Sequence, residues 1–160
     1  MTPNFNIEEV CEKCYYDPRS HSFHLLTEND FEKYYYTCPA MAKHYDDAEG
    51  IIKHMYLELN NLNKPWIWIF DCAGFGLKHL CATQVAHKII EFLNKTNESF
   101  NLKHLIIVNQ NFTSNIMINI LWYLLDKRVI NKFIFDKKKQ FVKVLDYDDR
   151  LSTIQKSLLY

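Results

Sequence analysis

The sequence has few residues that would interrupt a folded core, since only three of its 160 residues are glycine and 48% are hydrophobic. Nineteen basic residues balance nineteen acidic ones, so there is no overall positive field to hold a nucleic-acid backbone. No apolar run approaches the roughly eighteen residues of a membrane span, and residues 1–10 lack the basic start and apolar core of a signal peptide. We therefore expect one ordered domain over residues 1–160, located in the cytoplasm, with no nucleic-acid partner.

The cysteines form an odd set of five, which without a secretory signal predicts free thiols in a reducing compartment. Cys11 and Cys14, followed by His21 and His24, offer the ligand types of tetrahedral zinc. Their spacing fits a zinc finger poorly, because six residues separate Cys14 from His21 where about twelve are usual. We therefore expect zinc to be absent and these four side chains to occupy the strands of a hairpin.

The first part of the chain predicts a hairpin and a helix. Residues 10–16 and 21–26 alternate loosely around a proline-containing turn at residues 17–20, which is typical of a β-hairpin. Residues 28–44 have a mixed pattern that predicts a short helix plus a loop. Apolar residues at helical spacing follow over residues 46–62 and indicate an amphipathic helix.

The second part alternates short apolar runs with helical patterns, which is typical of an α/β domain with crossover helices. Two crossovers between buried strands predict a mixed, largely parallel sheet with right-handed connections and helices on at least one face. The expected elements are a strand at 66–70, a helix at 77–92, a strand at 105–108, a helix at 113–125, a strand at 132–135, an edge strand at 141–145 and a terminal helix at 147–160.

Motifs for nucleotide binding and catalysis are incomplete. Gly74 and Gly76 follow a predicted strand, as in a dinucleotide-binding loop, but His79 stands where the third glycine belongs. No phosphate-binding G-x-x-x-x-G-K-S/T run occurs. We expect no cofactor.

A nucleophilic site would need Cys72 or Cys81 beside His79 or His87, with Asp71 to orient the imidazole. Nothing in the sequence fixes that geometry, and Cys81 falls on an apolar helix stripe, where an inert buried thiol is the common outcome. We expect the protein not to be an enzyme.

The predicted helix near residues 112–125 is apolar around almost its whole circumference, with a polar stripe only at Asn111, Asn115 and Asn119. Such a helix must contact a second apolar phase. That phase is either protein, in the core or in an oligomer contact, or a lipid cavity on one side and a membrane surface on the other. Fourteen residues are too few to span a bilayer.

Three segments together are similar to the CRAL-TRIO lipid-binding family. Residues 66–74 (WIWIFDCAG) resemble its apolar strand ending in Asp-x-x-Gly, residues 102–109 (LKHLIIVN) resemble its next strand, and residues 112–135 resemble its gate helix, basic turn and following strand. The agreement covers about half of the chain. The resemblance implies a sheet with one face closed by the gate helix over a hydrophobic ligand such as a phospholipid, sterol-like or retinoid molecule.

The sequence also departs from this family. We expect a domain without the helical extension that often precedes it, and residues 136–160 lack the family's usual proline and paired glycines. In members that bind phosphatidylinositol, a lysine before the last parallel strand contacts the headgroup, and Lys132 occupies that position. The acidic partner position falls near Phe100, so recognition of inositides is not implied.

The resemblance implies two groups of site residues and a cavity of several hundred cubic ångströms, the usual range of ligand sites. The expected lipid pocket and gate comprise Trp66, Trp68, Phe70, Phe112, Ile116, Ile120, Leu121 and Leu124. The expected contacts with a headgroup or a transient membrane surface are Lys127, Arg128 and Lys132. Lys127 and Arg128 have an alternative role, because cations at a helix C-terminus offset the macrodipole by about 0.3 to 1 kcal/mol.

Two functions from different classes follow from the resemblance. The first is non-enzymatic binding or transfer of a lipid or another hydrophobic small molecule. The second is an interaction module of the BCH type, which binds a small GTPase or another protein without a lipid cavity. The bulky aromatic residues either line a pocket or fill it, and this difference separates the two hypotheses.

Overall fold

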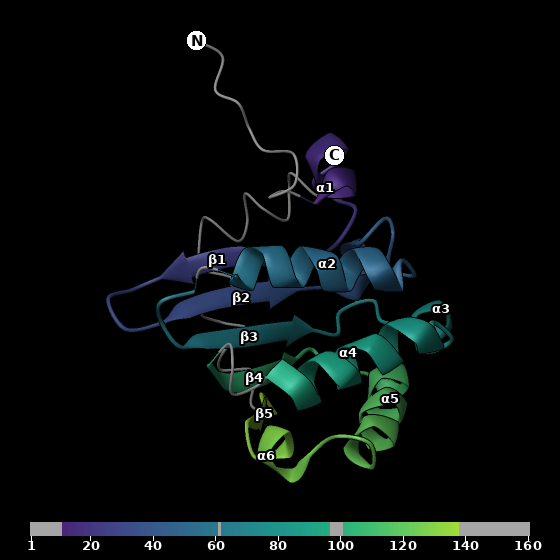
Figure 1. Ribbon diagram of the computed structural model, residues 1–160. Helices are drawn as coiled ribbons and strands as arrows, with labels where there is room; N and C mark the ends of the chain where they lie inside the picture. Colours follow the sequence, from purple (N-terminus) through teal and green to yellow (C-terminus); the bar gives the residue numbers. More distant parts are fainter. Residues whose placement is uncertain (1–10, 61, 97–100, 138–160) are drawn as a thin grey trace.

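The computed structural model describes residues 11–60, 62–96 and 101–137, and within them the chain forms one five-stranded sheet (Figure 1). The strands lie in the order β1-β2-β3-β4-β5; β1 is antiparallel to β2, and the other neighbours are parallel. The predicted α/β class with a mixed, largely parallel sheet is confirmed. The strands are β1 (His24–Glu28), β2 (Lys33–Thr37), β3 (Trp66–Asp71), β4 (Leu102–Val108) and β5 (Phe133–Phe135).

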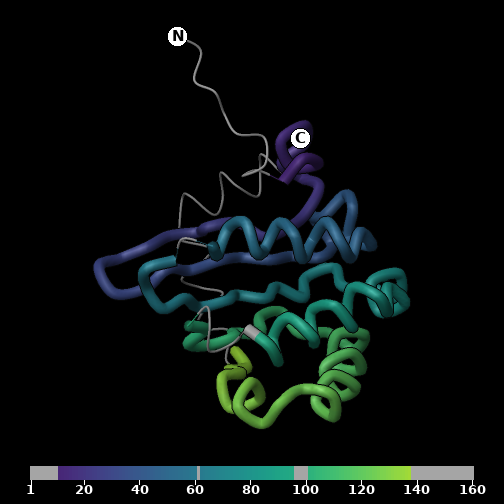
Figure 2. Tube along the Cα trace, in the orientation of Figure 1, coloured from purple at the N-terminus to yellow at the C-terminus, as the bar shows by residue number. Residues whose placement is uncertain are grey.

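Helices connect the parallel strands. Each crossover leads to the next strand in the sheet, so connections of one hand place their helices on the same face. Helices α2 and α4 lie side by side across that face, as the trace in Figure 2 also shows. The helices are α1 (Glu12–Tyr16), the 3₁₀ helix η2 (Pro39–Met41), α2 (Ala48–Leu59), α3 (Leu77–Leu80), α4 (Thr83–Thr96), α5 (Phe112–Trp122) and α6 (Lys127–Ile130).

The central strand β3 divides the core into two clusters. All six of its residues are buried, and alternate side chains point to opposite faces of the sheet. Trp66, Trp68 and Phe70 join the cluster under the helices, whereas Ile67 and Ile69 belong to a smaller cluster on the other face. The continuous apolar run in the sequence therefore reflects burial on both faces.

The loop after β3 is fixed by the buried carboxylate of Asp71. Its Oδ2 accepts a hydrogen bond from the Tyr36 hydroxyl at 2.5 Å, and its Oδ1 accepts from Asn109 Nδ2 at 3.0 Å and from the backbone N–H of Ala73 at 2.9 Å. Gly74 then turns the chain with φ of +71°, and an added Cβ would lie 2.9 Å from the Cβ of Ala40. The family-like Asp-x-x-Gly pattern thus ties together the ends of three strands.

The predicted hairpin at residues 10–26 is wrong, because residues 12–16 form helix α1. The turn between its supposed strands does exist. The Asp17 carboxylate accepts a hydrogen bond from the backbone N–H of Arg19 at 3.0 Å, and the same two side chains form an ion pair. A local polar turn therefore follows a helix rather than a strand.

The antiparallel hairpin forms instead between β1 and β2. Asn29 closes its turn, since its Oδ1 accepts hydrogen bonds from the backbone N–H groups of Phe31 and Glu32, both at 2.8 Å. Strand β2 replaces the helix predicted within residues 28–44, because the consecutive tyrosines favour an extended chain packed beside β3. The strand and helix predicted at 141–145 and 147–160 lie outside the described residues.

Candidate functional site: an apolar pocket under the helices

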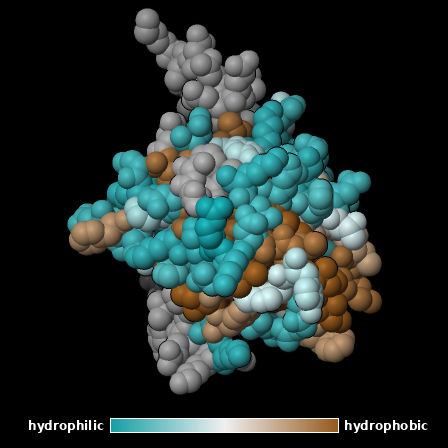
Figure 3. All heavy atoms as spheres, turned by 60° about the horizontal axis from the view of Figure 1, so that its bottom comes forward, coloured by the Kyte–Doolittle hydropathy of each residue, from teal (hydrophilic) through white to brown (hydrophobic). Residues whose placement is uncertain are grey.

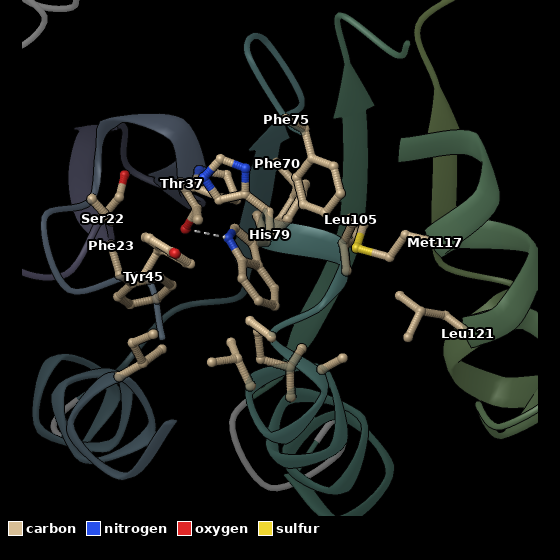
Figure 4. Close-up of a pocket in the computed structure, with 18 of the residues that line it drawn as sticks. Ser22, Phe23, Thr37, Tyr45, Phe70, Phe75, His79, Leu105, Met117 and Leu121 are labelled. Carbon is tan, nitrogen blue, oxygen red and sulfur yellow. Dashed lines mark hydrogen bonds between the residues drawn. The ribbon is translucent and has the colours of Figure 1, made fainter. Parts of the chain in front are cut away.

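An apolar pocket lies between the helix-covered face of the sheet and helices α2, α4 and α5 (Figure 4). Its cavity volume is about 110 Å³, which is smaller than the several hundred cubic ångströms expected from the sequence. Strand alternation supplies the floor, because every second side chain of β3 and β4 faces the helices. The main lining side chains are Trp68, Phe70, Leu105 and Ile107 from the sheet and Ile51, Met55, Ala86, Ile89, Met117 and Leu121 from the helices.

One side of the pocket carries polar groups. Figure 4 shows Ser22, Thr37 and Tyr45 on the side opposite Met117 and Leu121. The Thr37 hydroxyl accepts a hydrogen bond from Trp68 Nε1 at 2.8 Å, which fixes the indole ring. The pocket is therefore polar on the side of Ser22, Thr37 and Tyr45 and apolar on the side of α5.

His79 contributes a buried imidazole to the lining of this pocket. Its Nδ1 accepts a hydrogen bond from the backbone N–H of Gly76 at 2.9 Å, so Nε2 carries the proton of the neutral ring. Burial lowers the pKa of His79, which favours the neutral ring near pH 7. Nε2 is buried, and a hydrogen bond with the backbone of Pro39 offsets part of the pKa lowering. From the sequence, His79 is a departure from a nucleotide-binding loop and a candidate base for a nucleophilic site, and neither pattern indicates a place in an apolar pocket.

A second, more open groove of about 650 Å³ runs between α4 and α5 on the outer side of the pocket. Ile120 and Leu124 line this groove, and both are exposed. Ala86, Met117 and Leu121 line both spaces. Side chains of α4 and α5 are therefore the partition between the inner pocket and the surface.

The outer side of α5 and the turn after it form an exposed apolar patch, made of Ile120, Trp122, Tyr123 and Leu124. Tyr123 is 91% exposed. Figure 3 shows hydrophobic side chains gathered on this side of the molecule. Only Ser114 and Ile118 of α5 are buried, so most of this helix faces either the groove or solvent. None of the helices in the described part of the chain is long and apolar enough to cross a membrane.

The structure distributes the sequence-predicted pocket residues over four environments. Trp68, Phe70 and Leu121 line the inner pocket, while Trp66 is buried in the core beside it. Ile120, Leu121 and Leu124 line the outer groove. Ile116 is half-buried and lines neither space, and Phe112 is 81% exposed at the start of α5.

The predicted cations lie just beyond the apolar patch. Helix α5 ends at Trp122, so the helix predicted to reach residue 125 stops earlier. Lys127 and Arg128 begin the separate helix α6, whose N-cap is Asp126, and Lys132 precedes β5. The suggested role of Lys127 and Arg128 at the C-terminus of the long helix is therefore wrong.

The nucleophile candidates from the sequence are not assembled into a site. The Asp71 carboxylate bonds Tyr36, Asn109 and Ala73 rather than a histidine. Burial raises the pKa of the Cys72 thiol to about 12, so this group stays protonated. Cys81 is exposed at the end of α3, which corrects its expected buried position.

The cysteine and histidine candidates are brought together in a different combination. Cys11, Cys14 and His21 lie close to one another, but their fourth neighbour is His54 of α2 and not His24. The zinc-finger spacing considered from the sequence paired His21 with His24, whereas the structure places His54 beside these residues. His54 is 33 residues from His21 in the sequence and sits on the buried face of a helix, where it reads as an ordinary core residue.

Comparison with known proteins adds one match to these observations. The family model for the CRAL/TRIO domain matches residues 14–152, which is most of the chain. Comparison with curated proteins gave no match. The matched range includes all five strands of the described residues, the apolar pocket and helix α5. With its mixed sheet, its helices on one face and an apolar pocket beneath them, the chain belongs to the CRAL/TRIO family.

Proposed function

We propose that the domain binds and transfers a hydrophobic ligand, with a phospholipid as the best-fitting class, and does so without catalysis. The family supports the binding of hydrophobic small molecules in general. The observation that carries the proposal for this chain is the arrangement of two adjoining spaces. The inner pocket is apolar, the outer groove opens to the surface, and only side chains such as Ala86, Met117 and Leu121 divide them.

Helix α5 is the proposed gate. A cavity of about 110 Å³ is below the roughly 300 to 1,000 Å³ of typical ligand sites, so a lipid fits only if the partition opens. Asn111 attaches the start of α5 to the loop after β3, because its Nδ2 donates to the carbonyls of Cys72 and Phe75 at 3.1 and 3.0 Å. The other end of α5 is exposed, and the turn after it contacts α4 through polar groups at Asn94 that an opening would have to release. Asn94 Nδ2 donates to the Leu124 carbonyl at 3.1 Å, and its Oδ1 accepts from the Asp126 N–H at 2.9 Å. Outward movement of that end would join the pocket to the groove.

The polar side of the pocket orients the ligand. An ester or amide group of the ligand would hydrogen-bond to polar side chains that line this side, among them Ser22, Tyr45 and His79. Apolar chains would extend along Trp68 and Phe70 toward Met117. This arrangement places the ligand's polar group away from α5 and its chain ends near the gate.

Filling the partition is expected to reduce ligand binding. Met117→Trp adds volume to the space shared by pocket and groove, so we expect the bulkier side chain to exclude ligand atoms and to lower affinity roughly 10- to 100-fold. Asn119→Trp is the matched control, because this residue lies exposed on the same helix. Affinity is measured by titrating each variant with a phosphatidylcholine that carries a fluorescent acyl chain. Equal affinity of the two variants would contradict a ligand path beside α5.

The same side of the molecule is the proposed membrane-facing surface. The exposed patch of Ile120, Trp122, Tyr123 and Leu124 offers apolar and aromatic side chains of the kind that enter a bilayer interface. Lys127, Arg128 and Lys132 follow it in the chain after Leu125 and the exposed Asp126, and the first two cations are exposed. An apolar patch beside cations suits transient contact with anionic lipids.

Neutralising these cations is expected to weaken membrane binding. Each Lys or Arg near an anionic surface contributes about 1 kcal/mol, so Lys127→Gln, Arg128→Gln and Lys132→Gln together should reduce binding by roughly 100-fold at low salt. Co-sedimentation with phosphatidylserine-containing vesicles measures the effect, which should shrink as salt screens the charges. The control combines Lys33→Gln, Lys53→Gln and Lys103→Gln, which changes net charge equally on β2, α2 and β4. If both triple variants bind alike, the membrane surface is located elsewhere.

The small cavity favours a second candidate function. Trp68, Phe70, Phe75 and Tyr45 occupy much of the space beneath the helices, as expected of a BCH-type module that binds a small GTPase or another protein. In that case the exposed patch on α5 would contact a protein rather than a membrane. A domain purified with no associated lipid and unable to extract one from vesicles would favour this function.

A further inference from the structure

We propose that Cys11, Cys14, His21 and His54 form a structural zinc site that fixes α1 to α2 at the edge of the apolar pocket. One potential ligand atom from each residue lies within 4.8 Å of all the others. The sulfurs of Cys11 and Cys14 lie 3.3 and 3.5 Å from Nδ1 of His21. Ligands of a tetrahedral zinc ion, with bonds of about 2.0 to 2.3 Å, are separated by roughly 3.3 to 3.8 Å, so both sulfur–nitrogen distances already fit. The remaining pairs, all within 4.8 Å, have to close by no more than about 1 to 1.5 Å.

His54 has a buried ring nitrogen for which the described residues provide no hydrogen-bond partner. Its Nε2 donates a hydrogen bond to the carbonyl oxygen of Phe23 at 2.8 Å, so in the neutral ring Nδ1 carries a lone pair. His54 is 6% exposed, and this Nδ1 is buried with no hydrogen-bond partner among the described residues. A buried lone pair beside two thiols and a second imidazole is suited to a metal ion, which would satisfy it.

His21 is held in the same tautomer by a carboxylate. Its Nε2 lies 2.8 Å from Oδ2 of Asp47, which leaves Nδ1 directed at the two sulfurs. Zinc-bound histidines usually donate their second N–H to a carboxylate or a backbone carbonyl, and here Asp47 and Phe23 serve the two rings in these two ways. The supporting contacts of a metal site are thus already present.

Gly50 provides the room that the carboxylate and imidazole need beside α2. An added Cβ at Gly50 would lie 2.0 Å from Oδ2 of Asp47 and 2.9 Å from Cε1 of His21. Asp47 also caps α2, since its side chain accepts a hydrogen bond from the Gly50 N–H at 3.3 Å. The first turn of α2 is therefore shaped around the Asp47–His21 pair.

Helix α1 requires an attachment such as a bound metal ion. It has five residues, none of them buried, and so short a helix is not stable by itself. Its described attachments include an ion pair between Lys13 and Asp47 at 2.8 Å and a hydrogen bond from the Ser20 hydroxyl to the Lys13 carbonyl at 3.1 Å. Zinc binding would release the two thiol protons to solvent and add its binding free energy to folding. His21 also lines the apolar pocket, so the ion would stiffen one pocket wall.

The order Cys14, His21, Asp47 also matches a nucleophile, base and orienting carboxylate. In that arrangement one thiol would face the base, whereas here two sulfurs share the same nitrogen. It would also leave the buried lone pair of His54 without a role. All four side chains and both supporting acceptors have a function in the metal site.

Metal content and cobalt spectroscopy test this site. We expect the purified chain to contain one equivalent of zinc by elemental analysis, and Co²⁺ exchanged for zinc to show the visible bands of tetrahedral cobalt with thiolate-to-cobalt charge transfer. Cys14→Ser and His54→Asn should lose the ion, whereas the matched controls Cys81→Ser and His24→Asn should keep it. Asp47→Asn retains the helix cap and should weaken zinc affinity about 10- to 100-fold in competition with a chromophoric chelator.

Several results would overturn the proposal. One is a folded parent chain that takes up no more zinc or cobalt than His54→Asn; another is equal loss of metal in His24→Asn and His54→Asn. A disulfide between Cys11 and Cys14 in protein purified under reducing conditions would also contradict it. If Cys14 is alkylated rapidly, and at the same rate with and without zinc, the result would support a nucleophilic site instead. Because Asp47→Asn is measured by metal affinity, the test does not depend on variants that fail to fold.

Discussion

Replacing Asp71 by alanine is expected to lower the free energy of unfolding by about 3 to 5 kcal/mol. The buried carboxylate accepts hydrogen bonds from Tyr36, Asn109 and the backbone of Ala73, and the substitution leaves these donors without an acceptor. Urea unfolding followed by circular dichroism measures the change. Asp30→Ala is the control, since this carboxylate is exposed and its loss should change stability by no more than about 0.5 kcal/mol.

The result would also explain the Asp-x-x-Gly pattern of the sequence in physical terms. Asp71 joins the ends of β2, β3 and the loop after β4, and Gly74 lets the chain pass close to Ala40. If Asp71→Ala and Asp30→Ala unfold at the same urea concentration, the network does not hold these strand ends together. The aspartate would then have to act through a ligand or a partner.

Trp68→Ala is expected to lower the free energy of unfolding by a similar amount, about 3 to 5 kcal/mol. Truncating a buried tryptophan removes apolar surface from the core and leaves a cavity. Trp68 is 1% exposed, packs against Phe23 and Phe70, and donates its indole N–H to Thr37. The control is Trp122→Ala on α5, whose side chain is partly exposed. Thermal and urea unfolding of both variants provide the measurement.

The Trp68 comparison also tests how the pocket is built. If the indole is part of a well-packed floor, Trp68→Ala destabilises far more than Trp122→Ala and enlarges the space for acyl chains. If Trp68→Ala lowers the free energy of unfolding by less than about 1 kcal/mol, the floor of the pocket is loosely packed, contrary to the burial of Trp68.

The central part of the fold could be predicted because its sequence signals are strong and local. The apolar runs that became β3 and β4 are buried on both faces or nearly so, and the helical stripe from Ala48 to Leu59 packs on the sheet. The N-terminal part could not, because its structure depends on contacts distant in the sequence. The tyrosines of β2 become a strand beside β3, and α1 depends on groups from α2.

The candidate site was predictable only in part, for the same reason. Trp68 and Phe70 belong to a strand whose alternation is fixed, so their facing the helices follows from the period of a strand. The environments of Phe112 and Ile116 depend on how α5 rotates against α3, which a helix apolar on all sides does not specify. His54 joins the cysteines only through the packing of α2, so spacing in the sequence pointed to His24 instead.

The most direct test of the proposed function is whether the folded protein retains a bound lipid after it is separated from vesicles. Purified protein is incubated with mixed phospholipid vesicles, separated from them by size exclusion, extracted with organic solvent and examined by mass spectrometry, with Met117→Trp as the control. We predict a phospholipid or other hydrophobic ligand near one equivalent per chain in the parent and far less in Met117→Trp. A folded parent chain that carries no more lipid than the variant would contradict lipid binding and leave the protein-interaction function as the better account.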